Sequence, residues 1–223
     1  MIPWQELGRA RAPDGGELVL RQRGGDYEIR VDGHDLMSNR AHGSEEEMAR
    51  LACAHVGSAE APRVLVGGLG MGYTLRATLD ALPPGGRAVV AEIVPAVVEW
   101  NRGPLASLAG NPLADPRSEV HVGDVGALLR TTTVRFDAIM LDVDNGPKAL
   151  TRKGNQLLYS PAGLETTKRA LRRDGVLAVW SSDRSKDFEA RLRKAGFRAE
   201  SIDVPARGAA GGPKHTIFMA KVA

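Results

Sequence analysis

VLVGGLGMGYTL, the stretch Val64–Leu75, is an apolar run that leads into alternating glycines and then into a helical pattern. Its alternating glycines are Gly68, Gly70 and Gly72. Glycine adopts backbone conformations that are closed to other residues, and it lets a ligand approach the main chain closely. Glu92 ends the next apolar run about 20 residues after Gly72, the spacing expected of an acid that binds the ribose hydroxyls of a nucleoside. The stretch therefore predicts a strand, a nucleotide-binding turn and a helix.

From Arg63 onward, β-rich runs alternate with helical patterns, which indicates a parallel sheet covered by helices on both faces. The predicted parallel strands are Val64–Gly68, Ala88–Ile93, Glu119–Gly123, Phe136–Val143 and Gly175–Ser181. The strongest helical patterns are Gly72–Leu82 and Gln156–Arg172. Two further strands, Arg198–Val204 and Thr216–Val222, have no room between them for a crossover helix and must pair antiparallel. The order predicts an α/β fold with a Rossmann-like class I methyltransferase sheet.

The region before the glycines is predicted to be a small β extension. Glu17–Arg23 and Tyr27–Asp32 flank two glycines, a pattern typical of a β-hairpin. Ser44 with Glu47 resembles an N-cap and its capping-box partner, so a helix is expected from there to about Val56. We expect an N-terminal hairpin extension over 1–43, a helix and linker over 44–62, and a cofactor-binding domain over 63–223.

Composition narrows the class of protein. The 223 residues carry a net charge of +3 and only 4% aromatic residues, which gives neither the basic surface nor the stacking rings expected of a nucleic-acid-binding protein. Cys53 is the only cysteine, and no apolar run reaches the ~20 residues of a membrane span. We expect a cytoplasmic protein that binds neither nucleic acid nor membrane.

Acidic residues follow the predicted strands, where ligands of open α/β sheets bind. Glu92 would bind ribose hydroxyls, and Asp124 would accept a hydrogen bond from an adenine amino group. Asp142 and Asp144 would face the reacting end, binding a cationic substrate or removing a proton from an attacking amine. The alternative for these two aspartates is a structural role, in which Asp144 and Asn145 cap the following loop. Tyr159 is predicted either to reach the same cleft or to pack a helix.

The histidines are scattered without the spacing of metal ligands, so no metal site is predicted. His42 lies between the hairpin and the next helix, where it would form either a lid over the cleft or an ordinary cap and turn. Trp180 ends a predicted strand and would line the substrate pocket or pack in the core.

Taken in order, these segments resemble the spermidine synthase (polyamine aminopropyltransferase) family. The resemblance is carried by VLVGGLGMGYTLR, by the acid at Glu92 with VPAVVEWNR after it, and by VGDVGALL, FDAIMLDVDNGP and LLYSPAGLETTKRALRRDGVLAVW. It implies a Rossmann-like fold and transfer from decarboxylated S-adenosylmethionine to a polyamine amine. By position, Glu92 resembles the ribose-binding acid, Asp124 the adenine-contacting acid and Asp142 the acid that deprotonates the amine. Tyr159 resembles an aromatic residue on the substrate side.

The chain departs from the family at two motifs. Members commonly read GGGDG, in which the aspartate binds the amine of the decarboxylated donor, and Met71 corresponds to that aspartate here. The usual DSSDP run is replaced by residues 142–147, DVDNGP. A neutral residue at position 71 removes a repulsion toward the carboxylate of ordinary S-adenosylmethionine, so the resemblance with this departure favours methyl transfer to an amine-bearing small molecule.

Three other functions stay open at this point: polyamine aminopropyl transfer, nucleoside binding without catalysis, and an NAD-dependent dehydrogenase, which the antiparallel C-terminal pair disfavours. A lone hairpin is marginal in water, and the family resemblance makes another subunit its partner surface. We therefore expect a homodimer that associates through the N-terminal region.

Overall fold

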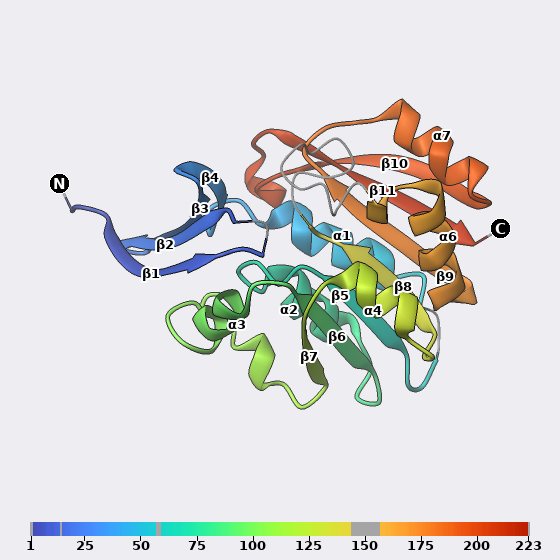
Figure 1. Cartoon of the computed structure of the whole chain (residues 1–223), viewed down its shortest axis with the longest axis horizontal. Coiled ribbons are helices and arrows are strands. Elements are labelled where there is room, and N and C mark those ends of the chain that lie inside the picture. The colour runs from blue at the N-terminus through green and yellow to red at the C-terminus, as the bar shows by residue number, and fades with distance from the viewer. Residues whose placement is uncertain (1, 14, 57–58, 144–156, 223) are drawn as a thin grey trace.

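The computed structural model describes residues 2–13, 15–56, 59–143 and 157–222, and in these ranges the chain forms two sheets. A four-stranded sheet at the N-terminus stands beside a seven-stranded sheet that is flanked by helices (Figure 1). Helix α1 (Gly43–Cys53) follows the smaller sheet and packs on the larger one. The predicted α/β architecture with an N-terminal β extension is confirmed.

The N-terminal sheet has the antiparallel order β1-β2-β3-β4. Its strands are β1 (Gln5–Arg11), β2 (Glu17–Arg23), β3 (Asp26–Val31) and β4 (His34–Ser38). The predicted hairpin is β2 with β3, which pair from Leu18 with Val31 to Arg23 with Asp26. The sequence analysis missed β1 and β4, whose runs QELGRAR and HDLMS lack a clear apolar alternation. The extension is thus a sheet of four strands.

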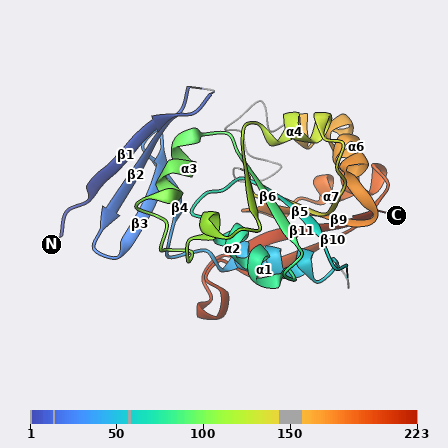
Figure 2. The ribbon, with the colours of Figure 1, turned by 90° about the horizontal axis from the view of Figure 1, so that it is seen from below.

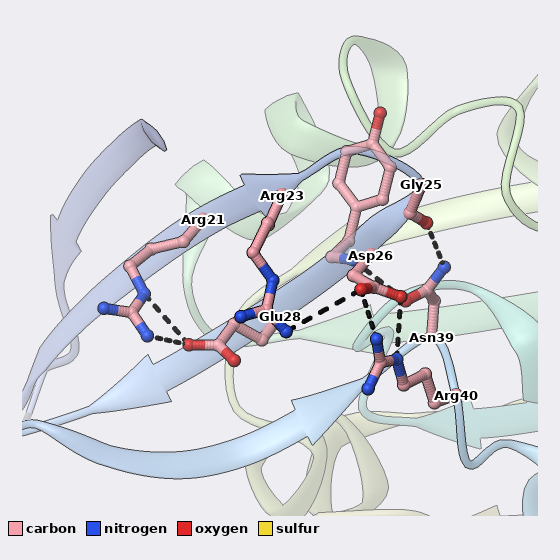
Figure 3. A network of polar contacts seen from close by, with 8 residues as sticks. Arg21, Arg23, Gly25, Asp26, Glu28, Asn39 and Arg40 are labelled. Atoms are coloured by element: carbon pink, nitrogen blue, oxygen red, sulfur yellow. Dashed lines mark hydrogen bonds and ion pairs between the residues drawn. The ribbon is translucent and has the colours of Figure 1, made fainter. Parts of the chain in front are cut away.

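Polar contacts fasten this sheet to the segment that enters α1 (Figure 3). Arg40 binds the carboxylate of Asp26 with two nitrogens, of which Nε lies 2.7 Å from Oδ1. Asn39 donates to the carbonyl of Gly25 and accepts from the amide of Tyr27, both at 2.9 Å. Further ion pairs join β2 to β3, namely Arg21 with Glu28 and Arg23 with Asp26. The start of α1 is therefore held at a fixed place relative to the sheet.

The large sheet has the order β10-β11-β9-β8-β5-β6-β7. Its strands are β5 (Arg63–Gly67), β6 (Arg87–Glu92), β7 (Ser118–Val122), β8 (Phe136–Leu141), β9 (Leu171–Ser181), β10 (Phe197–Pro205) and β11 (Lys214–Val222). Strands β5 to β9 are parallel, whereas β11 is antiparallel to both β9 and β10. This is the predicted topology, including the antiparallel C-terminal pair.

Helices cover both faces of the large sheet (Figure 2). On one face α1, α2 (Tyr73–Ala81) and α3 (Pro95–Arg102) share a core with buried residues of the N-terminal sheet, including Leu20 and Ile29. On the other face lie α4 (Val125–Thr131), α6 (Pro161–Ala170) and α7 (Lys186–Lys194). Short 3-10 turns occur at Pro112–Ala114 and Gly208–Ala210. Among the described helices, none is long and apolar enough to cross a membrane.

Two predicted helix boundaries are wrong. Ser44 is not the N-cap of α1: His42 holds that position, and the hydroxyl of Ser44 bonds to other side chains instead. The helix expected over Gln156–Arg172 is shorter, because Ser160 caps α6 by accepting from the amide of Gly163 at 3.1 Å. It ends before Leu171, which pairs with β8.

The point where the strand order reverses lies between β5 and β8. The chain runs from β5 outward through β6 and β7 and then returns to place β8 on the other side of β5. Gly67 and Leu141, the last residues of β5 and β8, pair with each other. The glycine turn after β5 and Asp142 after β8 therefore leave the sheet side by side, where open α/β sheets bind their ligands.

Candidate active site

The glycine turn is shaped by backbone conformations that only glycine adopts without strain. Gly68, Gly70 and Gly72 have φ values of +94°, +51° and +88°. A Cβ atom on Gly68 would lie 2.2 Å from the carbonyl oxygen of Asp142, so this position also has no space for a side chain. The turn after β5 therefore passes directly over the chain that leaves β8.

Neighbouring elements hold the turn from two sides. Asn101 of α3 donates from Nδ2 to the carbonyl of Gly70 at 2.8 Å. From the other side, Met37 of β4 lies against Gly70, where an added Cβ would be 3.1 Å from its sulfur. The N-terminal sheet is thus part of the wall around the turn.

Glu92 is buried with 7% of its surface exposed, and it is bonded to the main chain. Its Oε2 accepts from the amide of Leu69 in the glycine turn at 3.0 Å, and its Oε1 accepts from the amide of Val94 at 2.8 Å. The carboxylate thus fixes the conformation of the turn from the end of β6.

Asp124 caps α4 by accepting from the amide of Ala127 at 2.7 Å, and 45% of its side chain is exposed. It follows β7, the edge strand next to β6. Glu92 and Asp124 therefore leave neighbouring strands on one side of the glycine turn, whereas Asp142 lies on the other side.

Asp142 is the carboxyl group at the centre of the site. Its Oδ2 accepts from the hydroxyl of Thr74, on the first turn of α2, at 2.8 Å. Burial raises its pKa to about 6, against the opposing effect of the Thr74 hydrogen bond. The ionised form is therefore poorly solvated, and a cationic ligand would stabilise it.

Glu45, in the first turn of α1, is a second acid at this place that the sequence analysis did not select. Burial and then the negative charge of Asp142 raise its pKa to about 7. The two carboxyl groups belong to α1 and the end of β8, which lie far apart in the sequence. We refer to Glu45 and Asp142 as the carboxyl pair.

The fully buried hydroxyl of Ser44 joins the carboxyl pair to the C-terminal strands. It donates to Oε2 of Glu45 at 2.6 Å. Nε1 of Trp180, near the end of β9, donates to it at 3.0 Å, and Nδ1 of His215 on β11 lies 2.9 Å away. The rings of Trp180 and His215 meet edge to face with centroids 4.6 Å apart. Trp180 is therefore a polar partner as well as a packing residue.

An aromatic pair lies beside the acids. The ring of His42 stacks on Tyr73 with centroids 3.9 Å apart, and its Nδ1 lies 2.8 Å from Oε1 of Glu46. Burial, Glu46 and then Glu45 raise the pKa of the Tyr73 hydroxyl. His42 is thus both the residue at the helix start and a side chain at the site.

A family model described as the spermine/spermidine synthase domain matches residues 45–189, more than half of the chain. The chain belongs to this family. A search of curated proteins returns no match to the sequence.

The fold of this chain is similar to the folds of solved spermidine synthase structures. A spermidine synthase from Thermotoga maritima superposes with a TM-score of 0.78 at 19% identity, over 98% of this chain and 73% of that one. A spermidine synthase in complex with the transition state analogue AdoDATO gives 0.74 at 18% identity, over 98% and 73%. The O-methyltransferase TomG from Streptomyces achromogenes, in complex with SAM, gives 0.54 at 22% identity, over 81% and 79%.

Two residues predicted for the site lie in the core of this spermidine synthase family member. Met71 is 3% exposed and belongs to the cluster beneath α1, α2 and α3. Tyr159 is 2% exposed in the cluster on the opposite face, where its ring meets Phe188 edge to face with centroids 5.5 Å apart. Asp144 lies outside the described residues. Of the acids predicted for the reacting end, Asp142 is therefore the one that the structure places next to a second buried acid, Glu45.

The residues missed by sequence reasoning are Ser44, Glu45, Tyr73 and His215. Ser44 and Glu45 resembled a helix start, and His215 stood alone in the sequence. The antiparallel return of β11 beside β9 brings His215 to α1. The predicted antiparallel C-terminal pair was therefore the sequence feature that could have indicated a place for His215 at the site. Within the described residues, no three histidine, cysteine or acidic side chains form a metal-binding group.

Proposed function

We propose that this protein is an aminopropyltransferase that moves the aminopropyl group of decarboxylated S-adenosylmethionine to an amine-bearing, cationic small molecule such as a polyamine. The observation that carries the proposal is the carboxyl pair. Burial raises the pKa of both acids, and the charge of Asp142 raises that of Glu45 further. A positive ligand would stabilise the ionised forms of both acids, and an ammonium group supplies that charge. Membership in the spermine/spermidine synthase family supports the same chemistry.

The charges at the site favour the decarboxylated donor over S-adenosylmethionine. Its tail ends in an ammonium group alone, whereas S-adenosylmethionine also carries a carboxylate that the carboxyl pair would repel. The argument for methyl transfer depended on a neutral side chain at position 71, but Met71 is buried in the core. The acids that set the local charge are instead Glu45 and Asp142.

The glycine turn and Glu92 would hold the adenosyl part of the donor. The turn presents main chain without side chains at Gly68, Gly70 and Gly72, and the carboxylate of Glu92, bonded to the turn, would accept from ribose hydroxyls. Asp124 would accept from the adenine amino group in addition to capping α4. The donor supplies an electrophilic carbon next to a sulfonium.

In the proposed reaction, Asp142 takes a proton from the substrate ammonium and leaves a neutral amine. The amine nitrogen forms a bond to the aminopropyl carbon as the bond from that carbon to sulfur breaks, and the sulfonium becomes a neutral thioether. The secondary ammonium product keeps its two remaining protons, so one proton is released per turnover. A base with a pKa near neutrality suits this role, because it accepts and returns protons readily.

The test is turnover of each donor with a panel of diamines and triamines, with product identified by chromatography. The proposal expects 5'-methylthioadenosine from the decarboxylated donor. Asp142→Asn should lower kcat on the order of a hundredfold or more. Glu47→Gln, on the same helix but paired with Arg50, is the matched control and should leave kcat unchanged. Formation of S-adenosylhomocysteine instead would support methyl transfer, and ligand binding without either product would support a non-catalytic binder.

A further inference from the structure

We propose that Ser44 and His215 form a proton path from the carboxyl pair to β11, along which the proton released by the substrate amine leaves the site. This inference rests on the proposed function, because the aminopropyl reaction releases one proton per turnover. Its geometry consists of two contacts through one hydroxyl, 2.6 Å to Glu45 Oε2 and 2.9 Å to His215 Nδ1.

Trp180 restricts how Ser44 can bond to the two ends of the path. A serine hydroxyl has one proton to donate and two lone pairs, whereas an indole N–H can only donate. The contact at 3.0 Å from Trp180 Nε1 therefore always occupies one lone pair of Ser44. One donor and one acceptor position remain for Glu45 and His215, so one of them must accept from Ser44 while the other donates to it.

It follows that the protonation of Glu45 and the tautomer of His215 are coupled. When Glu45 is ionised, Ser44 donates to it and His215 presents Nδ1–H. When Glu45 is protonated at Oε2, it donates to Ser44, which donates to a bare Nδ1, and the ring proton of neutral His215 lies on Nε2. For each proton that Asp142 passes to ionised Glu45 within the carboxyl pair, Glu45 gives a proton to Ser44, Ser44 gives its hydroxyl proton to Nδ1, and Nε2 releases its own.

The surroundings of both ends contain other titratable groups. Glu45 faces Asp142 after β8 and Glu46 on its own helix, and Tyr73 on α2 lies close to both glutamates. His215 is half-buried, which lowers its pKa, and Asp183 after β9 opposes that shift. On β10, Asp203 is bonded to Thr216 and Arg184. A neutral imidazole beside a protonatable glutamate is the state that a relay requires.

The first test follows the His215 ring by nitrogen NMR across pH 5 to 9, in the full chain without substrate. The wild-type ring should change tautomer as Glu45 ionises, because the raised pKa of Glu45, about 7, lies inside that range. Glu45→Gln removes the ionisation and should remove the tautomer change, whereas Glu47→Gln should preserve it. A wild-type tautomer that stays constant while Glu45 titrates overturns the path, whether or not the protein turns over a donor.

The second test is chemical rescue during turnover. His215→Ala should lower kcat about tenfold or more near neutral pH while donor affinity stays within about twofold, and added imidazole should restore rate. His34→Ala, at an exposed histidine of β4, is the control: its kcat should equal that of wild type, and added imidazole should not change it. A loss of kcat that imidazole leaves unaffected, with the pH profile unchanged in shape, would show a structural role and overturn the path. If the wild-type protein turns over no aminopropyl donor while the tautomer coupling is present, the proposed function fails and the hydrogen-bond chain stands.

Discussion

The carbonyl oxygen of Asp142 occupies the place where a side chain on Gly68 would begin, 2.2 Å from an ideal Cβ. This contact joins the turn after β5 to the acid after β8. It is therefore the point where the proposed donor site and the carboxyl pair meet.

Gly68→Ala should destabilise the fold by more than about 2 kcal/mol, because it combines a positive φ with a steric clash against main chain. Gly15→Ala is the matched control, since Gly15 has φ +95° but nothing within 4 Å of its Cβ position. The control should cost only about 1 kcal/mol for the backbone conformation. Denaturant unfolding measures both values, and equal costs would mean that the Asp142 contact has no energetic effect.

The raised pKa values of the carboxyl pair should make the stability of the protein depend on pH. The folded-state pKa values, about 7 for Glu45 and about 6 for Asp142, lie above the ordinary values of 4.5 and 3.8. The folded state therefore binds more protons in this window, and its free energy of unfolding falls as pH rises from about 4.5 to 8. Glu45→Gln should be more stable than wild type at pH 8, on the order of 1 kcal/mol, and nearly equal to it at pH 4.5.

Glu47→Gln is the control for that measurement, because Arg50 lowers the pKa of Glu47 and gives the opposite sign. The decisive quantity is the difference between the free energies of unfolding of wild type and Glu45→Gln. A difference that does not change with pH between 5 and 8 would contradict the placement of the carboxyl pair.

Glu92→Ala should weaken both the fold and the binding of adenosyl ligands. The variant loses the acceptor for two amides of the turn region, which should cost about 1 to 3 kcal/mol of stability. Asp124→Ala loses a single exposed cap and should cost about 1 kcal/mol. Unfolding and calorimetric titration with 5'-methylthioadenosine separate the two effects, and unchanged affinity in both variants would remove these acids from the proposed donor site.

We expect a homodimer that associates through the N-terminal sheet. Ile2 is 66% exposed at the end of the chain beside this sheet, and a charge there should weaken an apolar interface. Sedimentation of Ile2→Asp at several concentrations should show more monomer than wild type. Val134→Asp, at a 39% exposed valine between α4 and β8, is the control. A wild-type protein that stays monomeric at every concentration would exclude this assembly.

The large sheet could be predicted from the sequence because each of its strands is marked by a short local run of residues. Apolar runs such as 138–141 and 176–180 are continuous, and the absence of a crossover before Thr216 required the antiparallel pair. The small sheet was harder, because β1 and β4 are half exposed and their sequences carry little alternation.

The site was only partly predictable for a different reason. Asp142 follows a buried strand, so its position is a property of the strand itself. Glu45 and His215 are brought together through Ser44 by the packing of α1 against β9 and β11, contacts between distant segments that no local pattern records. Met71 shows the converse, since alignment with a motif fixes a position in the sequence but not the direction of the side chain.

The contact of Met37 with Gly70 makes the N-terminal sheet a thermodynamic partner of the glycine turn. Any molecule that binds the sheet and displaces Met37 changes the free energy of ligand binding at the turn. By reciprocity, a ligand at the turn changes the affinity of the sheet for that molecule by the same factor. Exchange of this sheet between family members would therefore change the affinity of the proposed donor site along with the surface.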